Sequence, residues 1–235
     1  MATVQEKIER FHQKLAKIEM GGGQAKIDKQ HEKGKYTARE RLDLLFDDKT
    51  FHEIGRFSGG NINKDIPGSA VVTGFGQIMG RTAGGYAQDF SVRGGTMGRA
   101  EGKKICHLLD MAMELKVPVI AVIDSGGARI QEGVEALTQY GRIFKKTCQA
   151  SGYIPQISLS LGPCAGGAVY CPALTDIVIM TKENSYIFVT GPEVVKAATG
   201  EHISMEDLGG GHVHNATSGV AHYLGENEAD AIDYA

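Results

Sequence analysis

The most regular pattern in the chain is an apolar, mostly β-branched run at residues 119–123, directly after Pro118. A short run without polar alternation predicts a strand buried on both faces, as in a parallel sheet covered by helices. The run ends in Asp124-Ser-Gly-Gly-Ala128, where adjacent glycines allow a sharp turn with accessible backbone N–H groups. A helical pattern follows over residues 134–148. The turn therefore lies near a helix N-terminus, where partial positive charge collects.

The same order of elements recurs downstream. Residues 157–161 predict a short strand, residues 162–168 (GPCAGGA) a glycine turn, and residues 169–174 the start of a helix. Glycine turns often do no more than join strands to helices. However, two parallel strands side by side would direct one backbone N–H from each turn at a common point, which is the geometry of an oxyanion hole. The repeat therefore favours a functional role for both turns.

The N-terminal part of the chain is predicted to be helical before the period changes to that of strands. Hydrophobic spacing predicts an amphipathic helix over residues 2–19, and a second helix or an extended connector over residues 25–35. Thr37-Ala-Arg-Glu40 is a capping box that opens a helix over residues 38–45. The β candidates that follow are residues 53–57, 70–74, 76–79 and 81–90, with a polar loop at 61–68.

The second half of the chain alternates helices and strands, which is typical of an α/β domain. We expect a helix at residues 99–115, strands at 176–180 and 186–189, a helix opening at Gly191-Pro192, a loop at 208–214 and a helix at 226–235. The last helix has neither a terminal glycine nor a cap, so we expect a fragment or one half of a split assembly. We divide the chain into a helical segment at 1–50 and an α/β domain at 51–235.

Composition supports a folded domain and narrows its partners. The 235 residues are 42% hydrophobic and 23% charged, which allows a sizeable core, and the net charge of −3 argues against nucleic acid as the main partner. No stretch approaches the ~18 apolar residues of a membrane span. The four cysteines include no C-x-x-C pair. The apolar surroundings of Cys106, Cys148 and Cys171 predict buried, reduced thiols in the cytoplasm.

Two further segments carry candidate chemistry. Residues 93–98 (RGGTMG) join a strand to a helix, and their glycines could let a ligand pass close to the backbone. The basic side chains here could meet phosphate groups, although such charges more often face water; they are Arg93, Arg99, Lys103 and Lys104. His212 and His214 lack a fixed third ligand, so structural hydrogen bonds are the preferred interpretation and no metal site is predicted.

Several longer motifs, in the same order along the chain, resemble the carboxyltransferase subunits of biotin-dependent acyl-CoA carboxylases and decarboxylases. The resemblance covers nearly the whole chain and includes subunits that act on propionyl-CoA and methylmalonyl-CoA. The matching motifs are residues 34–42 (GKYTARERL), 124–133 (DSGGARIQEG), 162–168 (GPCAGGA), 172–176 (PALTD), 190–192 (TGP), and 208–210 (LGG) with His214.

The resemblance implies an α/β fold, a crotonase-like or ClpP-like spiral of ββα units, preceded by an N-terminal helical collar. It implies that the chain is the first of two related domains, the one that holds acyl-CoA. The backbone N–H groups near the two turns would hold the thioester carbonyl and stabilise an enolate; these catalytic residues are Gly127, Ala128, Gly166 and Gly167. The residues expected to line the substrate are Gly94, Gly95, Gly126, Arg129 and Ala165.

The resemblance also implies partners. Biotin would be carried on a partner protein or domain, and coenzyme A would be part of the substrate. A biotin carboxyl carrier, a biotin carboxylase or a membrane decarboxylase subunit, and the second carboxyltransferase half would assemble with this chain, which would form a homo-oligomer. Neither nucleic acid nor direct membrane insertion is expected.

Three other interpretations stay open at this point. A stand-alone crotonase-like hydratase or isomerase needs carboxylates as general acid and base, and Glu132 and Glu135 lie near the first turn. A peptidase of the related spiral fold needs a nucleophile at the second turn, where Cys164 is the candidate. A non-catalytic scaffold that binds CoA esters would complete a site only with a partner.

Overall fold

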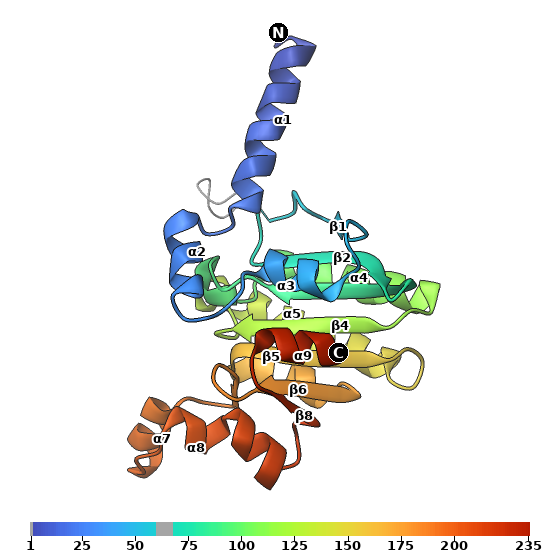
Figure 1. Cartoon of the computed structure of the whole chain (residues 1–235). Helices are drawn as coiled ribbons and strands as arrows, with labels where there is room; N and C mark the ends of the chain where they lie inside the picture. Colours follow the sequence, from blue (N-terminus) through green and yellow to red (C-terminus); the bar gives the residue numbers. More distant parts are fainter. Residues whose placement is uncertain (1, 60–67) are drawn as a thin grey trace.

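The computed structural model describes residues 2–59 and 68–235, so most of the predicted polar loop at 61–68 lies outside the described residues. One sheet of eight strands runs through this part of the chain, in the order β1-β2-β3-β4-β5-β6-β8, with β7 also paired to β5 (Figure 1). The strands are β1 (His52–Ile54), β2 (Val71–Ile78), β3 (Arg81–Gln88), β4 (Val119–Ser125), β5 (Gln156–Ala165), β6 (Ile177–Thr181), β7 (Tyr186–Phe188) and β8 (Tyr223–Gly225).

The sheet changes direction once along its width. The pairs β1–β2 and β2–β3 are antiparallel, whereas the pairs β3–β4, β4–β5, β5–β6 and β6–β8 are parallel. Every residue of β4 is buried, as its unbroken apolar run predicted. The carboxyl ends of β4 and β5 are therefore side by side at one edge of the sheet, and each continues into a glycine turn.

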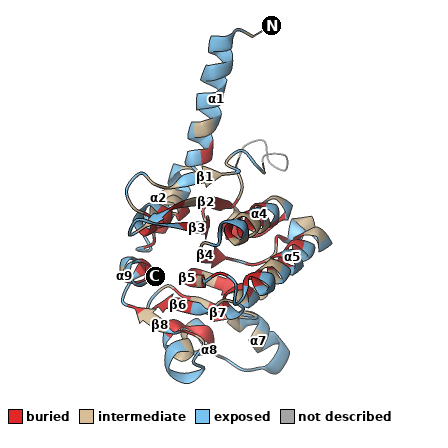
Figure 2. Ribbon diagram, turned by 90° about the vertical axis from the view of Figure 1, so that its right-hand side faces the viewer, coloured by how far each residue is buried: buried red, intermediate tan, exposed pale blue. Residues whose placement is uncertain are grey.

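Helices cover both faces of the sheet (Figure 2). They are α1 (Val4–Glu19), α2 (Gln24–His31), α3 (Ala38–Leu45), α4 (Arg99–Leu115), α5 (Val134–Ala150), α6 (Tyr170–Ala173), α7 (Pro192–Thr199), α8 (Met205–Gly209) and α9 (Glu228–Tyr234). One core lies under α4, α5 and α6, and a second lies under α3 and α9. Among the described residues, none of the helices is long and apolar enough to cross a membrane.

The N-terminal helices differ in how they use their apolar side chains. Helix α1 extends away from the sheet, and the side chains of Val4 and Phe11 are 74% and 49% exposed (Figure 1). Helix α3 begins at the predicted capping box, with the Thr37 hydroxyl accepting from the backbone N–H of Glu40. Leu42 and Leu45 of α3 are buried on the sheet. The division of the chain at residue 50 stays a prediction.

Several predicted elements differ from the structure. Residues 70–74 and 76–79 form the single strand β2, because its glycines keep the ladder to β3. Strand β5 continues through Pro163 to Ala165, because this stretch pairs with β7. The predicted loop at 208–214 is wrong, since α8 and a π-helix, Val213–Thr217, occupy it. Cys148 is exposed rather than buried, and Cys106 is half-buried, whereas Cys164 and Cys171 are buried.

Candidate functional site

The two glycine turns lie next to each other at the carboxyl ends of β4 and β5. The parallel ladder pairs Ser125 with Cys164, after a shift of register. A Cβ atom placed on Gly127 would lie 3.8 Å from the backbone nitrogen of Gly167. The structure thus brings the two turns together, as their repeated sequence predicted.

Most backbone N–H groups of the first turn donate hydrogen bonds to other groups of the protein. Gly126 donates to the carbonyl oxygen of Gly94 at 3.0 Å, and Gly127 donates to the Ser125 hydroxyl at 3.1 Å. Arg129 donates to the carbonyl oxygen of Met97 at 2.8 Å. The N–H of Ala128 has no acceptor among the described residues, because the parallel bridge between Met97 and Ala128 uses only the flanking groups. One free donor therefore remains in this turn.

The second turn also leaves one donor free. Gly166 begins a short 3-10 helix, η3 (Gly166–Val169), and its N–H donates to the carbonyl oxygen of Val189 at 3.2 Å. The first N–H groups of a helix have no acceptor within it. The next group, the N–H of Gly167, has none elsewhere in the described part of the chain. Of the four predicted catalytic residues, Ala128 and Gly167 therefore keep free N–H groups, while Gly127 and Gly166 shape the turns.

The glycines of the two turns differ in how much room their surroundings leave for a side chain. Gly127 has φ +92°, and a Cβ atom there would lie 2.6 Å from the carbonyl oxygen of Ala165. A Cβ atom on Gly167 would lie 3.0 Å from the Tyr140 ring. Gly126 is different, because its nearest neighbour would be the Thr96 methyl group at 3.5 Å, which is an ordinary contact. A side chain is thus excluded at Gly127, crowded at Gly167 and accommodated at Gly126.

The third glycine segment supports the first turn. Gly94 and Gly95 lie in a 3-10 helix, η1 (Arg93–Gly95), and Gly95 packs against the backbone of Asp124. The carbonyl oxygen of Gly95 accepts from the Ser125 hydroxyl at 2.8 Å. The segment therefore lies beside the turn, as expected for a substrate-lining element, and its contact with substrate stays a prediction.

Arg129 fastens the first turn to the start of α4. Its side chain is only 5% exposed and donates to Glu101 at 2.9 Å and to Glu132 at 2.7 Å. It also donates to the Thr96 carbonyl oxygen at 2.7 Å. Burial raises the pKa of Glu101, but hydrogen bonding and the charge of Arg129, with the Ala70 N–H, outweigh it and lower that pKa below its usual value. The predicted contact of Arg129 with substrate stays a prediction.

The carboxylates that a hydratase would need as general acid and base already accept hydrogen bonds from other residues of the protein. Glu132 accepts from Arg129 and, at 2.7 Å, from the backbone N–H of Arg99. Glu135 accepts from the Gln139 amide at 2.7 Å. Cys164 is fully buried, and burial raises the pKa of its thiol, which disfavours a nucleophilic thiolate. Neither the hydratase nor the peptidase interpretation gains support from these contacts.

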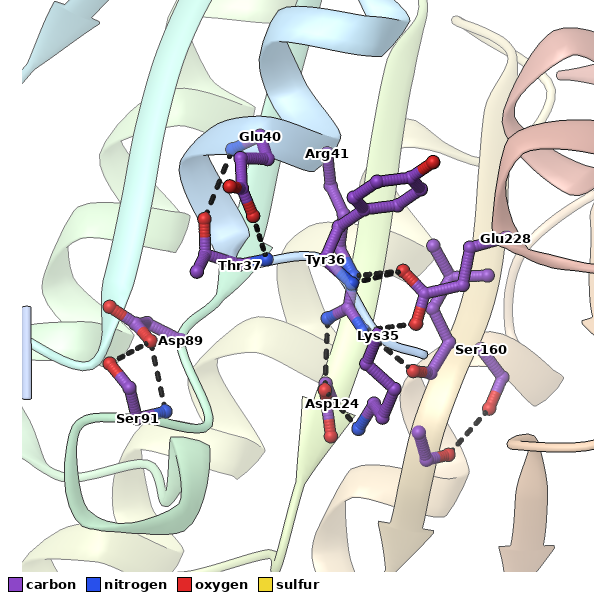
Figure 3. A network of polar contacts seen from close by, with 12 residues as sticks. Lys35, Tyr36, Thr37, Glu40, Arg41, Asp89, Ser91, Asp124, Ser160 and Glu228 are labelled. Carbon is purple, nitrogen blue, oxygen red and sulfur yellow. Dashed lines mark hydrogen bonds and ion pairs between the residues drawn. The ribbon is translucent and has the colours of Figure 1, made fainter. Parts of the chain in front are cut away.

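A buried cluster of four charged groups lies behind the first turn (Figure 3). Arg41 is fully buried and donates to Asp124 at 2.9 Å, to Glu228 at 2.6 Å and to the carbonyl oxygen of Leu161 at 2.8 Å. The Lys35 ammonium lies 2.6 Å from Asp124. Burial lowers the pKa of Arg41, but Asp124 and Glu228 outweigh burial and raise it, so Arg41 stays charged.

This charged cluster is a part of the site that the sequence reasoning missed. It joins α3 and the loop before it to the end of β4, strand β5 and helix α9. A signal was present, because Asp124 is a charged residue at the end of a fully apolar strand. Such a residue in a buried strand requires a partner, but its sequence position alone does not say which.

The remaining candidates have structural partners. Lys104 is buried and donates to the Val71 carbonyl oxygen at 2.6 Å and to the Ser69 hydroxyl at 3.2 Å, and burial lowers its pKa to about 8. Arg99 and Lys103 are exposed, and Arg93 is half-buried.

His214 contacts the Ile187 carbonyl oxygen at 2.7 Å and the Ser218 hydroxyl at 2.9 Å, which confirms its structural role. No group of three or more metal-binding side chains occurs among residues 2–59 and 68–235.

An apolar pocket of about 350 Å³ opens beside the second turn. Val169, which follows the turn directly, forms part of its wall, and so does Val189, which accepts the Gly166 N–H. The other side chains around it are mostly aliphatic and come from α6, β7, α7 and α8. The pocket thus places apolar surface next to a free backbone donor.

Comparison with known proteins places these features in a family. Residues 29–235 match the family described as Carboxyl transferase domain. The chain is 53% identical to the methylmalonyl-CoA decarboxylase subunit alpha of Veillonella parvula, over 99% of this chain and 47% of that protein. It is 50% identical to the mitochondrial propionyl-CoA carboxylase beta chain of Homo sapiens, over 95% of this chain and 43% of that protein.

A solved structure agrees with the sequence relatives. The crystal structure of transcarboxylase 12S with methylmalonyl-coenzyme A and methylmalonic acid bound superposes with a TM-score of 0.94 at 41% identity, over 100% of this chain and 47% of that chain. This likeness confirms the predicted α/β, crotonase-like fold with its N-terminal helix. The chain spans about half the length of the relatives it matches.

Proposed function

Because the chain belongs to the carboxyl transferase domain family, we propose that it is the acyl-CoA-binding half of a biotin-dependent carboxyltransferase. One observation carries the proposal. The N–H groups of Ala128 and Gly167 have no acceptor in the described residues, and they lie on adjacent turns at the ends of neighbouring strands. Two such donors suit the carbonyl oxygen of a thioester.

The two donors would act on charge that develops during the reaction. As a carboxyl group joins or leaves the α-carbon of the acyl-CoA, negative charge collects on the thioester oxygen. Backbone N–H groups held in place by the turns stabilise that enolate without having to reorganise. Biotin, carried by a partner, would supply or accept the carboxyl group. The paired carboxylates near the first turn are not needed as an acid–base pair.

The substrate proposed is a short acyl-CoA, with propionyl-CoA or methylmalonyl-CoA favoured. The sequence relatives carry these names, and the apolar pocket of about 350 Å³ beside the second turn has room for a short acyl chain. The proposed lining of the bound ester consists of Gly94, Gly95, Gly126, Ala165 and, next to them, Arg129.

The proposed partners follow from the same family. They are a biotin carboxyl carrier, a biotin carboxylase or a membrane decarboxylase subunit, the second carboxyltransferase half, and further copies of this chain in a homo-oligomer. Support for an oligomer comes from transcarboxylase 12S, whose structure is described as a hexamer assembly. We place this assembly in the cytoplasm.

The test compares two ligands that differ only at the carbonyl group. Propionyl-CoA and its thioether analogue S-propyl-CoA are titrated by calorimetry into the chain, alone and together with the second carboxyltransferase half. Two hydrogen bonds of about 0.5–1.5 kcal/mol each predict roughly tenfold tighter binding of the ester. The variant Ala128→Pro lacks one donor and should lose most of this preference, while Ala128→Ser keeps it. Equal affinity of the two ligands in the folded assembly would contradict the proposal.

A further inference from the structure

Beyond the ladder between β4 and β5, no hydrogen bond among the described residues joins residues 126–128 of the first turn to residues 166–168 of the second. Gly126 donates to Gly94, Gly166 donates to Val189, and Gly127 donates to Ser125 within its own turn. The ladder between β4 and β5 ends at Ser125 and Cys164. Beyond that last ladder pair, packing contributes to the distance between the two donors. An oxyanion site needs both donors about 2.7–3.1 Å from one oxygen atom, so this distance matters.

Tyr140 of α5 packs against the second turn. Its side chain is buried, with 2% exposure. A Cβ atom on Gly167 would lie 3.0 Å from Cδ2 of the ring and 3.1 Å from Cε2. The ring therefore lies flat against the backbone that carries the second free donor, and only glycine allows this approach without displacement.

The hydroxyl end of the same side chain faces the first turn. It makes no hydrogen bond within the described residues, and burial raises the pKa of the Tyr140 phenol, although the nearby Ser125 hydroxyl acts to lower it. Ser125 is the residue that accepts the Gly127 N–H and donates to the Gly95 carbonyl oxygen. One rigid side chain thus reaches from Gly167 to the support of the first turn.

We propose that Tyr140 is a positioning residue that sets the spacing of the two donor turns. An aromatic ring has two side-chain torsions and is stiff across its width, so it serves as a spacer of constant thickness. Because the hydroxyl makes no hydrogen bond, the expected contribution comes from the space that the side chain fills, most of it the ring. The inference rests on the proposed function for its chemical meaning, but the spacing itself is a property of the unliganded chain.

The first measurement needs no ligand. Backbone amide signals of Ala128 and Gly167 are recorded by NMR for the unaltered chain and for Tyr140→Phe, Tyr140→Leu and Ile143→Ala. Ile143 is a matched control, since it is buried on the same helix and in the same core. We expect single signals in the unaltered chain, Tyr140→Phe and Ile143→Ala. In Tyr140→Leu, both turns should show doubled or exchange-broadened signals. Unchanged single signals at both turns in Tyr140→Leu would overturn the inference.

The second measurement reads the consequence for bound ester. Isotope-edited infrared spectra of propionyl-CoA labelled at the thioester carbon report how strongly the two donors polarise the carbonyl. The shift to lower frequency should persist in Tyr140→Phe and Ile143→Ala, and the roughly tenfold preference over S-propyl-CoA should persist with it. Both should shrink in Tyr140→Leu. No shift in the unaltered assembly would overturn the proposed function, and the amide signals would still decide the spacing.

Gly167→Ala keeps Tyr140 and so covers the case in which Tyr140→Leu folds poorly, and a double variant tests the same contact from both sides. Gly167→Ala pushes a methyl group into the ring, so it should disturb both turns from the opposite side. Adding Tyr140→Leu to Gly167→Ala gives the methyl group room, because leucine is smaller than tyrosine. We expect the double variant to bind and polarise the ester better than Gly167→Ala alone. A double variant that is worse than both single variants would count against the spacer role.

Discussion

The two Gly-Gly-Ala turns share a local sequence, yet the protein holds them by different means. The first turn is tied by hydrogen bonds to Gly94 and, through the Ser125 hydroxyl, to Gly95, and Arg129 connects it to Glu101. The glycines of the second turn, after the pairing of β5 with β7 ends, have one backbone bond to Val189 and otherwise pack on the Tyr140 ring and apolar neighbours. Buried charges are costly to leave unpaired, whereas apolar contacts lose energy in proportion to the atoms removed. Removing a charged partner of the first turn should therefore lower the unfolding free energy sharply. Removing apolar atoms beside the second turn should lower it in proportion to the atoms lost.

The largest effect is expected from Arg129→Met, which leaves the Glu101 carboxylate buried without its partner. Breaking a buried ion pair from one side costs about 3–5 kcal/mol of unfolding free energy. Urea unfolding measures the loss. Arg99→Met is the matched control, because the Arg99 side chain is 62% exposed and its change should stay within about 0.5 kcal/mol. Equal losses of unfolding free energy in Arg129→Met and Arg99→Met would show that the buried ion pair does not make the first turn especially sensitive. The contrast with the second turn would then disappear.

Gly127→Ala should come next. The residue has φ +92°, and the new methyl group would meet the Ala165 carbonyl oxygen, so we expect a loss of about 2–3 kcal/mol. The preference for propionyl-CoA over S-propyl-CoA should also disappear. The adjacent Gly126→Ala is a close control, since its methyl group has only ordinary contacts and should change stability by less than about 1 kcal/mol. A well-tolerated Gly127→Ala would show that the turn is less constrained than its geometry indicates.

The second turn should respond more moderately, in two separable ways. Gly167→Ala crowds the Tyr140 ring and should cost about 1–3 kcal/mol and weaken the ester preference. Gly166→Ala meets nothing within 4 Å but has φ +59°, so it should cost only about 1–2 kcal/mol and leave the preference unchanged. Unfolding and ligand titration of the pair measure both effects. If Gly166→Ala abolishes the preference, the second donor does not depend on Tyr140 packing alone.

The smallest expected effect is a pH dependence of the unfolding free energy, which arises from the ion pair of the first turn. The pKa of Glu101 is lowered in the folded protein from its ordinary value of 4.5, so its ion pair contributes full stability above that value. The contribution is lost as the pH falls below 4.5 and through the lowered pKa. Between pH 6 and pH 3, unfolding free energy should fall less steeply in Glu101→Gln than in the unaltered chain. Gly167→Ala should keep the steeper dependence. Parallel curves for all three proteins would contradict this assignment.

Local patterns predicted much of the fold because local physics dominates those elements. The unbroken apolar run marked β4, and the capping box at Thr37 marked the start of α3. The repeated glycine turns predicted their adjacency, which follows from parallel neighbours in a sheet. The extension of β5 was missed because Gly162 and Pro163 usually interrupt strands, whereas here the pairing with β7 outweighs that tendency.

The polar support of the site could not be predicted in the same way. Arg41 meets Asp124 across 83 positions and Glu228 across 187 positions of the chain, and no local pattern connects them. Lys104 lies in a basic run that predicts exposure, yet its stem and ammonium group are buried beside β2. Which backbone donors stay free also depends on tertiary partners, such as the Val189 carbonyl oxygen.

The ion pair between Arg41 and Glu228, which are far apart in the chain, has a consequence for folding during synthesis on the ribosome. Neighbouring strands of the sheet follow one another closely in the chain, so most of the sheet can assemble while the polypeptide emerges. Until residue 228 has emerged, Lys35 and Arg41 face Asp124 as the one carboxylate of their cluster. A nascent chain in that state carries an uncompensated charge behind its first turn. Glu228 is thus the last member of this cluster to be synthesised, and we expect a product that stops before it to be more open to proteolysis than one that contains it.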